Sequence, residues 1–150
     1  MNPFDLKAVI LAKHAQHVVV IHFPIALFIA SFIFDLLGRW RRDRRFSIAA
    51  YYNLVAAAIM AVVAAGTGLI AWRWMLEGQK LKGALKLHLI LGLTSTGLVW
   101  LVTAWRIRLH KKPEECLPTS YLAVALLASA VIALTGHVGG VLSGVEGPPG

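Results

Sequence analysis

The chain has 150 residues, of which 58% are hydrophobic and only 15% are charged, and its mean hydropathy is +0.70. This composition excludes an ordinary soluble domain, in which charged residues make up about a quarter of the chain. The net charge of +8 and the pI near 10.2 would favour nucleic-acid binding in a soluble protein. In a chain this apolar we attribute the charge to basic loops beside a membrane, and we expect no nucleic-acid partner.

Apolar runs long enough to cross a bilayer lie at residues 18–37, 48–72, 85–105 and 120–136. A hydrocarbon core about 30 Å thick needs roughly 20 helical residues. Lipid admits only helices and closed barrels, and these runs lack the period-2 alternation of barrel strands. We therefore predict an all-α integral membrane protein, with residues 1–150 as a single domain. Because the connections are short, successive helices should be antiparallel neighbours in an up-down four-helix bundle.

Most of the lysines and arginines fall in two loops on one side of this bundle, RWRRDRR at residues 39–45 and RIRLHKK at residues 106–112. Basic loops stay in the cytoplasm, so both termini should face the outer side of the membrane. The single cysteine, Cys116, then lies in an inner loop and can form no internal disulfide. We interpret residues 2–16 as a short outer segment rather than as a cleaved signal peptide.

Packing features are visible in the second and third runs. The second run is rich in alanine and glycine, and the third contains GLTSTG at residues 92–97. Small residues let helices approach closely in lipid, and hydroxyl groups can bond between them. Asp35 lies near the inner end of the first run, where we predict an ion pair with Arg39 or interfacial snorkelling in preference to a proton relay. No internal repeat is evident.

Histidines from distant parts of the chain fall on the outer side of this topology: His14, His17, His22, His88 and His137. His110 is alone on the inner side, where we expect a solvated loop residue. Taken singly, each of the others is most simply a wet interfacial residue or a hydrogen-bonding group between helices. Their convergence favours a site instead, because ionisable side chains inside a membrane are functional-site candidates by default.

A b-type haem is the leading hypothesis for the occupant of this site. It needs one or two axial imidazoles from facing helices and an apolar slot for the ring. We predict that two of His22, His88 and His137 bind the iron, with His22 and His88 as the pair and His137 as a hydrogen-bonding or capping residue. His17 belongs to the same set, and Gly92, one turn below His88, leaves room for a porphyrin face. The protein would then be an electron-transfer subunit.

Backbone features near these histidines are consistent with a pocket. Pro24 removes a helical hydrogen bond and bends the first helix, so that His22 can be aimed inward. The segments GTG and GHVGG permit close approach and non-helical backbone in a protein-lined pocket. Their glycines are Gly66, Gly68, Gly139 and Gly140.

Other interpretations remain open. Three imidazoles also suit copper or zinc, with His22, His88 and His137 as ligands. A quinone pocket is another alternative, and a cofactor-free accessory subunit whose histidines serve packing is a further one. The sequence has no nucleophile–base pair, phosphate loop or paired carboxylates, so we expect no enzyme activity of the chain on its own.

The segment HFPIALFIASFIFDLLG (His22–Gly38), together with TGHVGGVLSGVEG (Thr135–Gly147), resembles a bacterial family of predicted four-helix membrane proteins with a domain of unknown function. His88 fits the same pattern, so the likeness covers nearly the whole chain. The resemblance implies a protein of the bacterial inner membrane that belongs to a redox module, and it implies no established activity. The positive-inside rule places the arginine-rich loops in the cytoplasm and the histidines on the periplasmic side. As partners in a redox module we expect other redox subunits, a periplasmic cytochrome or a quinone.

Overall fold

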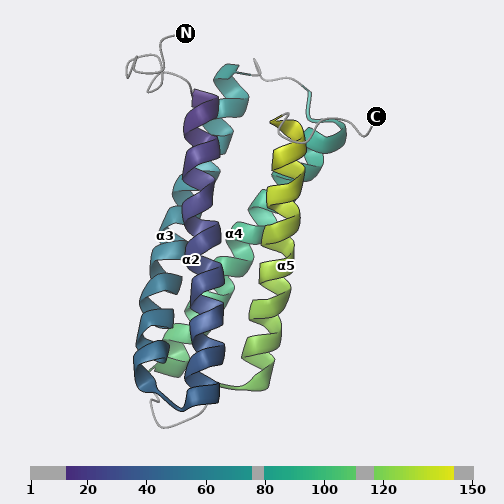
Figure 1. Cartoon of the computed structure of the whole chain (residues 1–150). Helices are drawn as coiled ribbons and strands as arrows, with labels where there is room; N and C mark the ends of the chain where they lie inside the picture. The colour runs from purple at the N-terminus through teal and green to yellow at the C-terminus, as the bar shows by residue number, and fades with distance from the viewer. Residues whose placement is uncertain (1–12, 76–79, 111–116, 144–150) are drawn as a thin grey trace.

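The computed structural model describes residues 13–75, 80–110 and 117–143, and this part of the chain is helical almost throughout. Its helices are α2 (Lys13–Arg41), α3 (Arg44–Met75), α4 (Gly83–His110) and α5 (Thr119–Leu142). Each of them is long and apolar enough to cross a membrane, and Figure 1 shows them side by side in one bundle. The predicted all-α membrane bundle is confirmed.

All four helices extend beyond the predicted apolar runs at both ends. Basic and aromatic residues continue a helix out of the hydrocarbon region because their long side chains reach the polar interface. α3 and α5 are also helical through the GTG and GHVGG segments, whose glycines would have permitted non-helical backbone. Packing against neighbouring helices overrides the low helix propensity of glycine there.

Successive helices run antiparallel, as predicted, and the bundle closes because α2 contacts α5 as well as α3, while α4 contacts α3 and α5. At one end of the bundle α2 and α4 begin, and α3 and α5 end; we call it the histidine end. At the opposite end α2 turns into α3; we call it the arginine end. There Arg42 adopts a left-handed conformation, with φ 54°. The carboxylate of Asp43 caps α3 by accepting a bond from the main-chain N–H of Arg45 at 2.9 Å.

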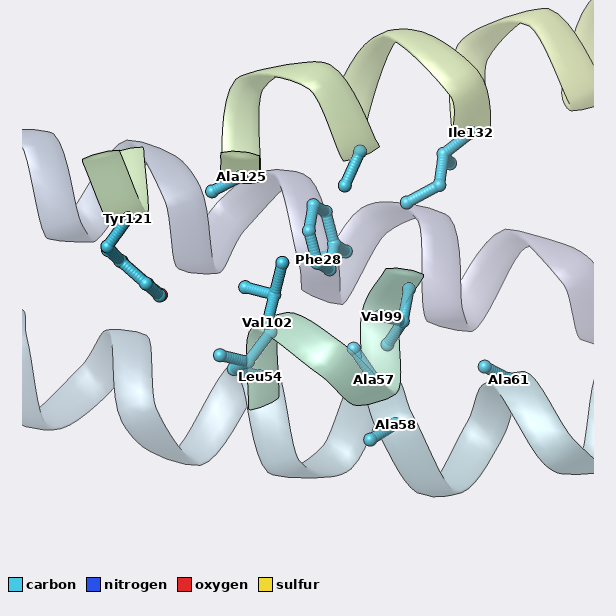
Figure 2. Close-up of a cluster of buried hydrophobic side chains, with 11 residues drawn as sticks. Phe28, Leu54, Ala57, Ala58, Ala61, Val99, Val102, Tyr121, Ala125 and Ile132 are labelled. Atoms are coloured by element: carbon cyan, nitrogen blue, oxygen red, sulfur yellow. The ribbon is translucent and has the colours of Figure 1, made fainter. Parts of the chain in front are cut away.

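The core between the helices is built from small and medium apolar side chains. Phe28 of α2 projects into its middle, with Val99 of α4 and Ile132 of α5 nearby (Figure 2). α3 contributes alanines to the same cluster, among them Ala57 and Ala61. Small side chains allow close approach of the helices, which is how membrane helices gain packing energy without a hydrophobic driving force.

The buried positions of the two halves of the chain repeat with a constant offset. Asp35 and Arg106 are both buried and are 71 residues apart. The same offset relates further pairs of buried residues in α2 and α4 and in α3 and α5: Pro24 and Ser95, Phe28 and Val99, Ser31 and Val102, Ala50 and Tyr121, Leu54 and Ala125, Ala57 and Ala128, Ala61 and Ile132. The chain therefore consists of two helical hairpins, α2–α3 and α4–α5, with matching inward faces. The sequence did not reveal this repeat because most matched positions share burial and not residue type.

A buried ion pair joins the two hairpins near the arginine end. The Arg106 guanidinium lies 2.9 Å from the carboxylate of Asp35, and their side chains are only 3% and 1% exposed. The hydroxyl of Tyr121 donates to the same carboxylate at 2.9 Å. Arg106 also donates to the carbonyl and hydroxyl oxygens of Ser47, at 3.0 and 2.8 Å. Each of the four helices thus contributes one side chain to this network.

The partner of Asp35 is not the one that the sequence predicted. Arg39 is exposed and donates to the main-chain carbonyl of Leu117, whereas Asp35 faces the interior and pairs with Arg106 of α4. Sequence proximity favoured Arg39, but a long arginine side chain one turn from the helix end reaches the polar interface. A buried carboxylate inside a bundle instead needs a buried partner.

Candidate functional site

The rings of His17 and His88 lie next to each other at the histidine end, in a T-shaped arrangement. Their centroids are 6.3 Å apart and their planes are inclined by 77°. His17 comes from the start of α2 and His88 from the start of α4, and both side chains are half-buried. Like Asp35 and Arg106, the two histidines occupy equivalent positions in the two hairpins. The pairing of helices therefore brings together imidazoles that are far apart in the sequence.

Each ring rests against a glycine of the next helix. A Cβ atom added at Gly68 would lie 2.9 Å from Cε1 of His17, and one added at Gly139 would lie 2.9 Å from Cε1 of His88. Side-chain carbons do not approach a ring so closely, so these ring positions require glycine at both places. Gly68 and Gly139 are themselves equivalent in the two hairpins. By contrast, an added Cβ at Gly66 meets no atom of another described helix within 4 Å.

The Nδ1 atoms of the two rings have different surroundings. Nδ1 of His17 lies 3.1 Å from the hydroxyl oxygen of Thr67, and that hydroxyl donates to the main-chain carbonyl of Ala64 at 2.9 Å. Nδ1 of His88 is buried and has no hydrogen-bond partner among the described residues. The main chain of Thr135 interacts with the His88 ring, but not through a hydrogen bond to Nδ1.

A cavity of about 350 Å³ adjoins the two rings. Most of its surface is apolar, and every helix of the bundle contributes to it, for example through Ile21, Ala64, Leu85 and Ile132. Its volume falls in the range of about 300–1,000 Å³ that is typical of small-molecule and cofactor sites. The arrangement thus consists of an apolar chamber with two imidazoles in its wall.

Polar groups in the cavity wall are bonded to one another. Thr135 donates its hydroxyl proton to the carbonyl of Val131 at 2.7 Å. The hydroxyl of Ser95, 2.8 Å from that of Thr135, therefore acts as the donor between them. Ser95 and Thr135 thus join α4 to α5. Because both hydroxyl protons are used within the protein, the cavity remains mostly apolar.

Two of the smaller predicted site residues line the cavity. Gly92 forms part of its wall, and a Cβ added there would meet no atom within 4 Å. Pro24 is buried and also lines the cavity. Among the other glycines predicted to shape the pocket, Gly140 is half-buried.

His22, which the sequence paired with His88, is not brought to this cavity. Its side chain is exposed, and Nδ1 donates to the carbonyl of Val18 in its own helix at 2.7 Å. Five residues separate His17 from His22, which corresponds to about 140° around a helix. When His17 faces the interior, His22 therefore faces outward, even though Pro24 follows it.

The structure does not place any of the remaining predicted histidines in the ring pair. The side chain of His137 is exposed, whereas the next residues, Val138 and Gly139, are buried and half-buried. His14 is in the first turn of α2 and His110 is the last residue of α4, and both of their side chains lie outside the described residues.

A periodic signal in the sequence could have selected His17. The inward face of α2 follows alternating spacings of three and four residues, as expected for helices that pack along a seam. Counted back toward the start of the helix, this face passes through Asp35, Ser31, Phe28, Pro24 and His17. The same spacing in α4 leads to His88.

The number of potential metal ligands at this site is small. Among the described residues, no three histidine, cysteine or carboxylate side chains are close enough together to hold a metal ion. Within the described part of the chain, the imidazoles of His17 and His88 are the histidine, cysteine or carboxylate ligands that line the cavity.

Fold and site together define a class of membrane proteins in which four spanning helices enclose an apolar cavity beside two neighbouring imidazoles. The chain belongs to the DUF2231 family of predicted membrane proteins, whose model matches residues 13–147. This membership confirms the resemblance seen in the sequence. No curated protein and no solved structure matches the chain.

Proposed function

We propose that the protein binds one b-type haem between His17 and His88 and serves as an electron-transfer subunit of a membrane redox system. The separation of the two rings carries this proposal. A metal–imidazole bond is about 2.0–2.1 Å long, so two rings on opposite sides of one metal ion have their centroids about 6 Å apart. The observed separation of 6.3 Å agrees with this arrangement.

The number of ligands supports haem over copper or zinc. Haem iron takes its equatorial nitrogens from the porphyrin and needs only one or two side chains. Zinc sites in proteins need about three or four side-chain ligands, and the described residues offer no such group. The proposed pair differs from the one predicted from sequence, because His17 takes the place of His22.

The surroundings of the two rings also suit a porphyrin. The cavity is mostly apolar. Gly68, Gly92 and Gly139 line it near the rings, where the lack of a side chain leaves space. A bound haem supplies one-electron chemistry. The chain would hold the iron through the two imidazoles and keep water from the ring by its apolar walls, and burial of this kind tunes the reduction potential.

The charge distribution supports a periplasmic location for the site. The arginine end carries exposed cations on both sides of the turn, among them Arg41, Arg42, Arg44 and Arg45, and such clusters stay in the cytoplasm. The histidine end would then exchange electrons with a quinone, a periplasmic cytochrome or another redox subunit. A membrane-impermeant maleimide should label Ser143→Cys in a Cys116→Ser background on intact bacterial cells. It should not label native Cys116, and the reverse pattern would overturn this orientation.

The absorption spectrum of the purified protein tests the haem proposal. We expect a Soret band and stoichiometric iron after expression with ample haem. The variants His17→Ala and His88→Ala should each lose most of the haem. The variant His22→Ala should retain it, because His22 lies on the same helix as His17 but faces away from the cavity. A wild-type protein without a Soret band, or with stoichiometric copper or zinc instead of iron, would contradict the proposal.

A further inference from the structure

We propose that the two histidines are inequivalent ligands, because Thr67 holds His17 in one tautomer with Nε2 as its ligating nitrogen, whereas Nδ1 of His88 has no such partner in the described part of the chain. The statement about tautomers stands on the hydrogen bonds of the chain alone. The statement about ligand strength rests on the proposed haem site.

The tautomer of His17 follows from a count of protons. A threonine hydroxyl has one proton to donate, and Thr67 donates it to the carbonyl of Ala64 at 2.9 Å. In its 3.1 Å contact with Nδ1 of His17, the Thr67 oxygen must therefore be the acceptor. Nδ1 then carries a proton, and in the neutral ring the lone pair that can bind a metal is on Nε2.

The second hairpin keeps the glycine beside the histidine and loses the hydroxyl. Gly139 occupies the position equivalent to Gly68, but the residue equivalent to Thr67 is Val138. Val138 is 9% exposed, and its side chain carries no hydrogen-bonding group. This difference between the hairpins explains why Nδ1 of His88 is buried without a partner among the residues that the structure describes.

The difference should change how firmly each ring binds a metal. A metal-bound histidine usually donates its other ring proton to a neighbour, which orients the ring and raises its basicity. Loss of such a partner typically costs about 10–100-fold in metal affinity. His17 would accordingly be the fixed ligand, and His88 the one that is displaced more easily.

The first experiment needs no cofactor. Nitrogen-15 NMR of histidine-labelled apoprotein in detergent, above the imidazole titration range, reports which ring nitrogen carries the proton. We expect His17, assigned by its absence in His17→Ala, to be protonated at Nδ1 in the wild type and in Thr67→Ser. Thr67→Val should yield a mixture of tautomers. A wild-type His17 protonated at Nε2, or an unchanged ring in Thr67→Val, would overturn the inference.

The second experiment titrates haem into the apoprotein and into variants of similar side-chain volume. Thr67→Val should bind haem about 10–100-fold more weakly than wild type, and Thr67→Ser should bind it normally. Val138→Thr, which adds the missing hydroxyl beside His88, should bind it more tightly. Carbon monoxide should displace His88 from reduced haem more readily in the wild type than in Val138→Thr.

The two proposals fail in different ways. A wild type that binds no haem would contradict the proposed function and leave the NMR result to decide the tautomer. A wild type that binds haem with equal affinity in all three variants would contradict the inequivalence of the ligands and leave the haem proposal in place.

Discussion

At the scale of single residues, the glycines beside the histidine rings impose the tightest steric limits at the site. Gly68→Ala places a methyl group 2.9 Å from Cε1 of His17, so the ring must move. We expect a loss of haem affinity of about tenfold or more, comparable with the loss of a group that orients a ligand. Titration of the apoprotein with haem, followed by absorbance, measures the change.

Gly66→Ala is the matched control for this variant. Gly66 lies in the same helix two residues earlier, and an added Cβ there meets nothing within 4 Å. Both substitutions raise helix propensity equally, so their difference reports the contact with the ring. Equal haem affinities of the two alanine variants would show that the close contact between Gly68 and the His17 ring does not affect haem binding.

Replacement of the buried Asp35 should reduce the stability of the bundle. Asp35→Asn leaves the Arg106 charge buried without its counter-ion, which typically costs about 3–5 kcal/mol of unfolding free energy. The measurement is unfolding in mixed micelles, with helical content as the signal. Joint replacement of Asp35 by Leu and Arg106 by Met should cost less than the single change, because no uncompensated charge remains.

Asp43→Asn provides the control at the surface. Asp43 pairs with Arg45 at 2.9 Å, but the arginine side chain is 90% exposed. The hydrogen bonds from Arg45 hold the pKa of Asp43 below its usual value, so this carboxylate is ionised at neutral pH and any stabilisation by the pair is lost only in acid. We expect no measurable change in unfolding at pH 7. A loss as large as that of Asp35→Asn would refute the special role of the buried pair.

At the scale of the elements, the two hairpins present matching inward faces, and Asp35 and Arg106 occupy equivalent positions on them. A charge exchange tests this equivalence. Asp35→Arg and Arg106→Asp should each reduce the amount of folded protein in the membrane, because each brings two like charges together. The double exchange should recover much of the loss, as coupled sites do in a double-mutant cycle. Additive losses in the double variant would contradict the equivalence.

Packing decides which side of each helix faces the interior of the bundle, and hydropathy has only a weak influence on it. In lipid an apolar side chain suits both the bundle interior and the outer surface, so hydropathy located the helices without selecting their inward sides. Phe28 is buried and Phe23 of the same helix is 55% exposed, although both are phenylalanines. For the same reason the sequence favoured His22, which is the histidine deeper in the apolar run.

At the scale of the whole molecule, each hairpin carries one histidine of the proposed pair and neither can form the site alone. A chain divided within residues 76–79 should yield two fragments that assemble when they are expressed together. We expect a Soret band in the co-purified fragments and none in either fragment alone. Haem bound stoichiometrically by one hairpin would contradict a site shared between His17 and His88.

The sequence by itself determined that the chain is surrounded by lipid, where its helices lie and which family it belongs to. Long apolar runs without period-2 alternation dictate spanning helices, because only helices and closed barrels satisfy the backbone in a bilayer. The short connections dictate the antiparallel order of these helices. The sequence also showed that histidines gather at one end, because topology alone places them there.

Only the tertiary structure decided which side chains meet. Three features depend on the rotation of each helix about its axis. These are the inward position of His17 rather than His22, the pairing of Asp35 with Arg106, and the contacts of Gly68 and Gly139 with the histidine rings. That rotation is set by the interlocking of side chains from all four helices. A run of apolar letters contains little information about it, because lipid and protein interior are almost equally favourable surroundings for such side chains.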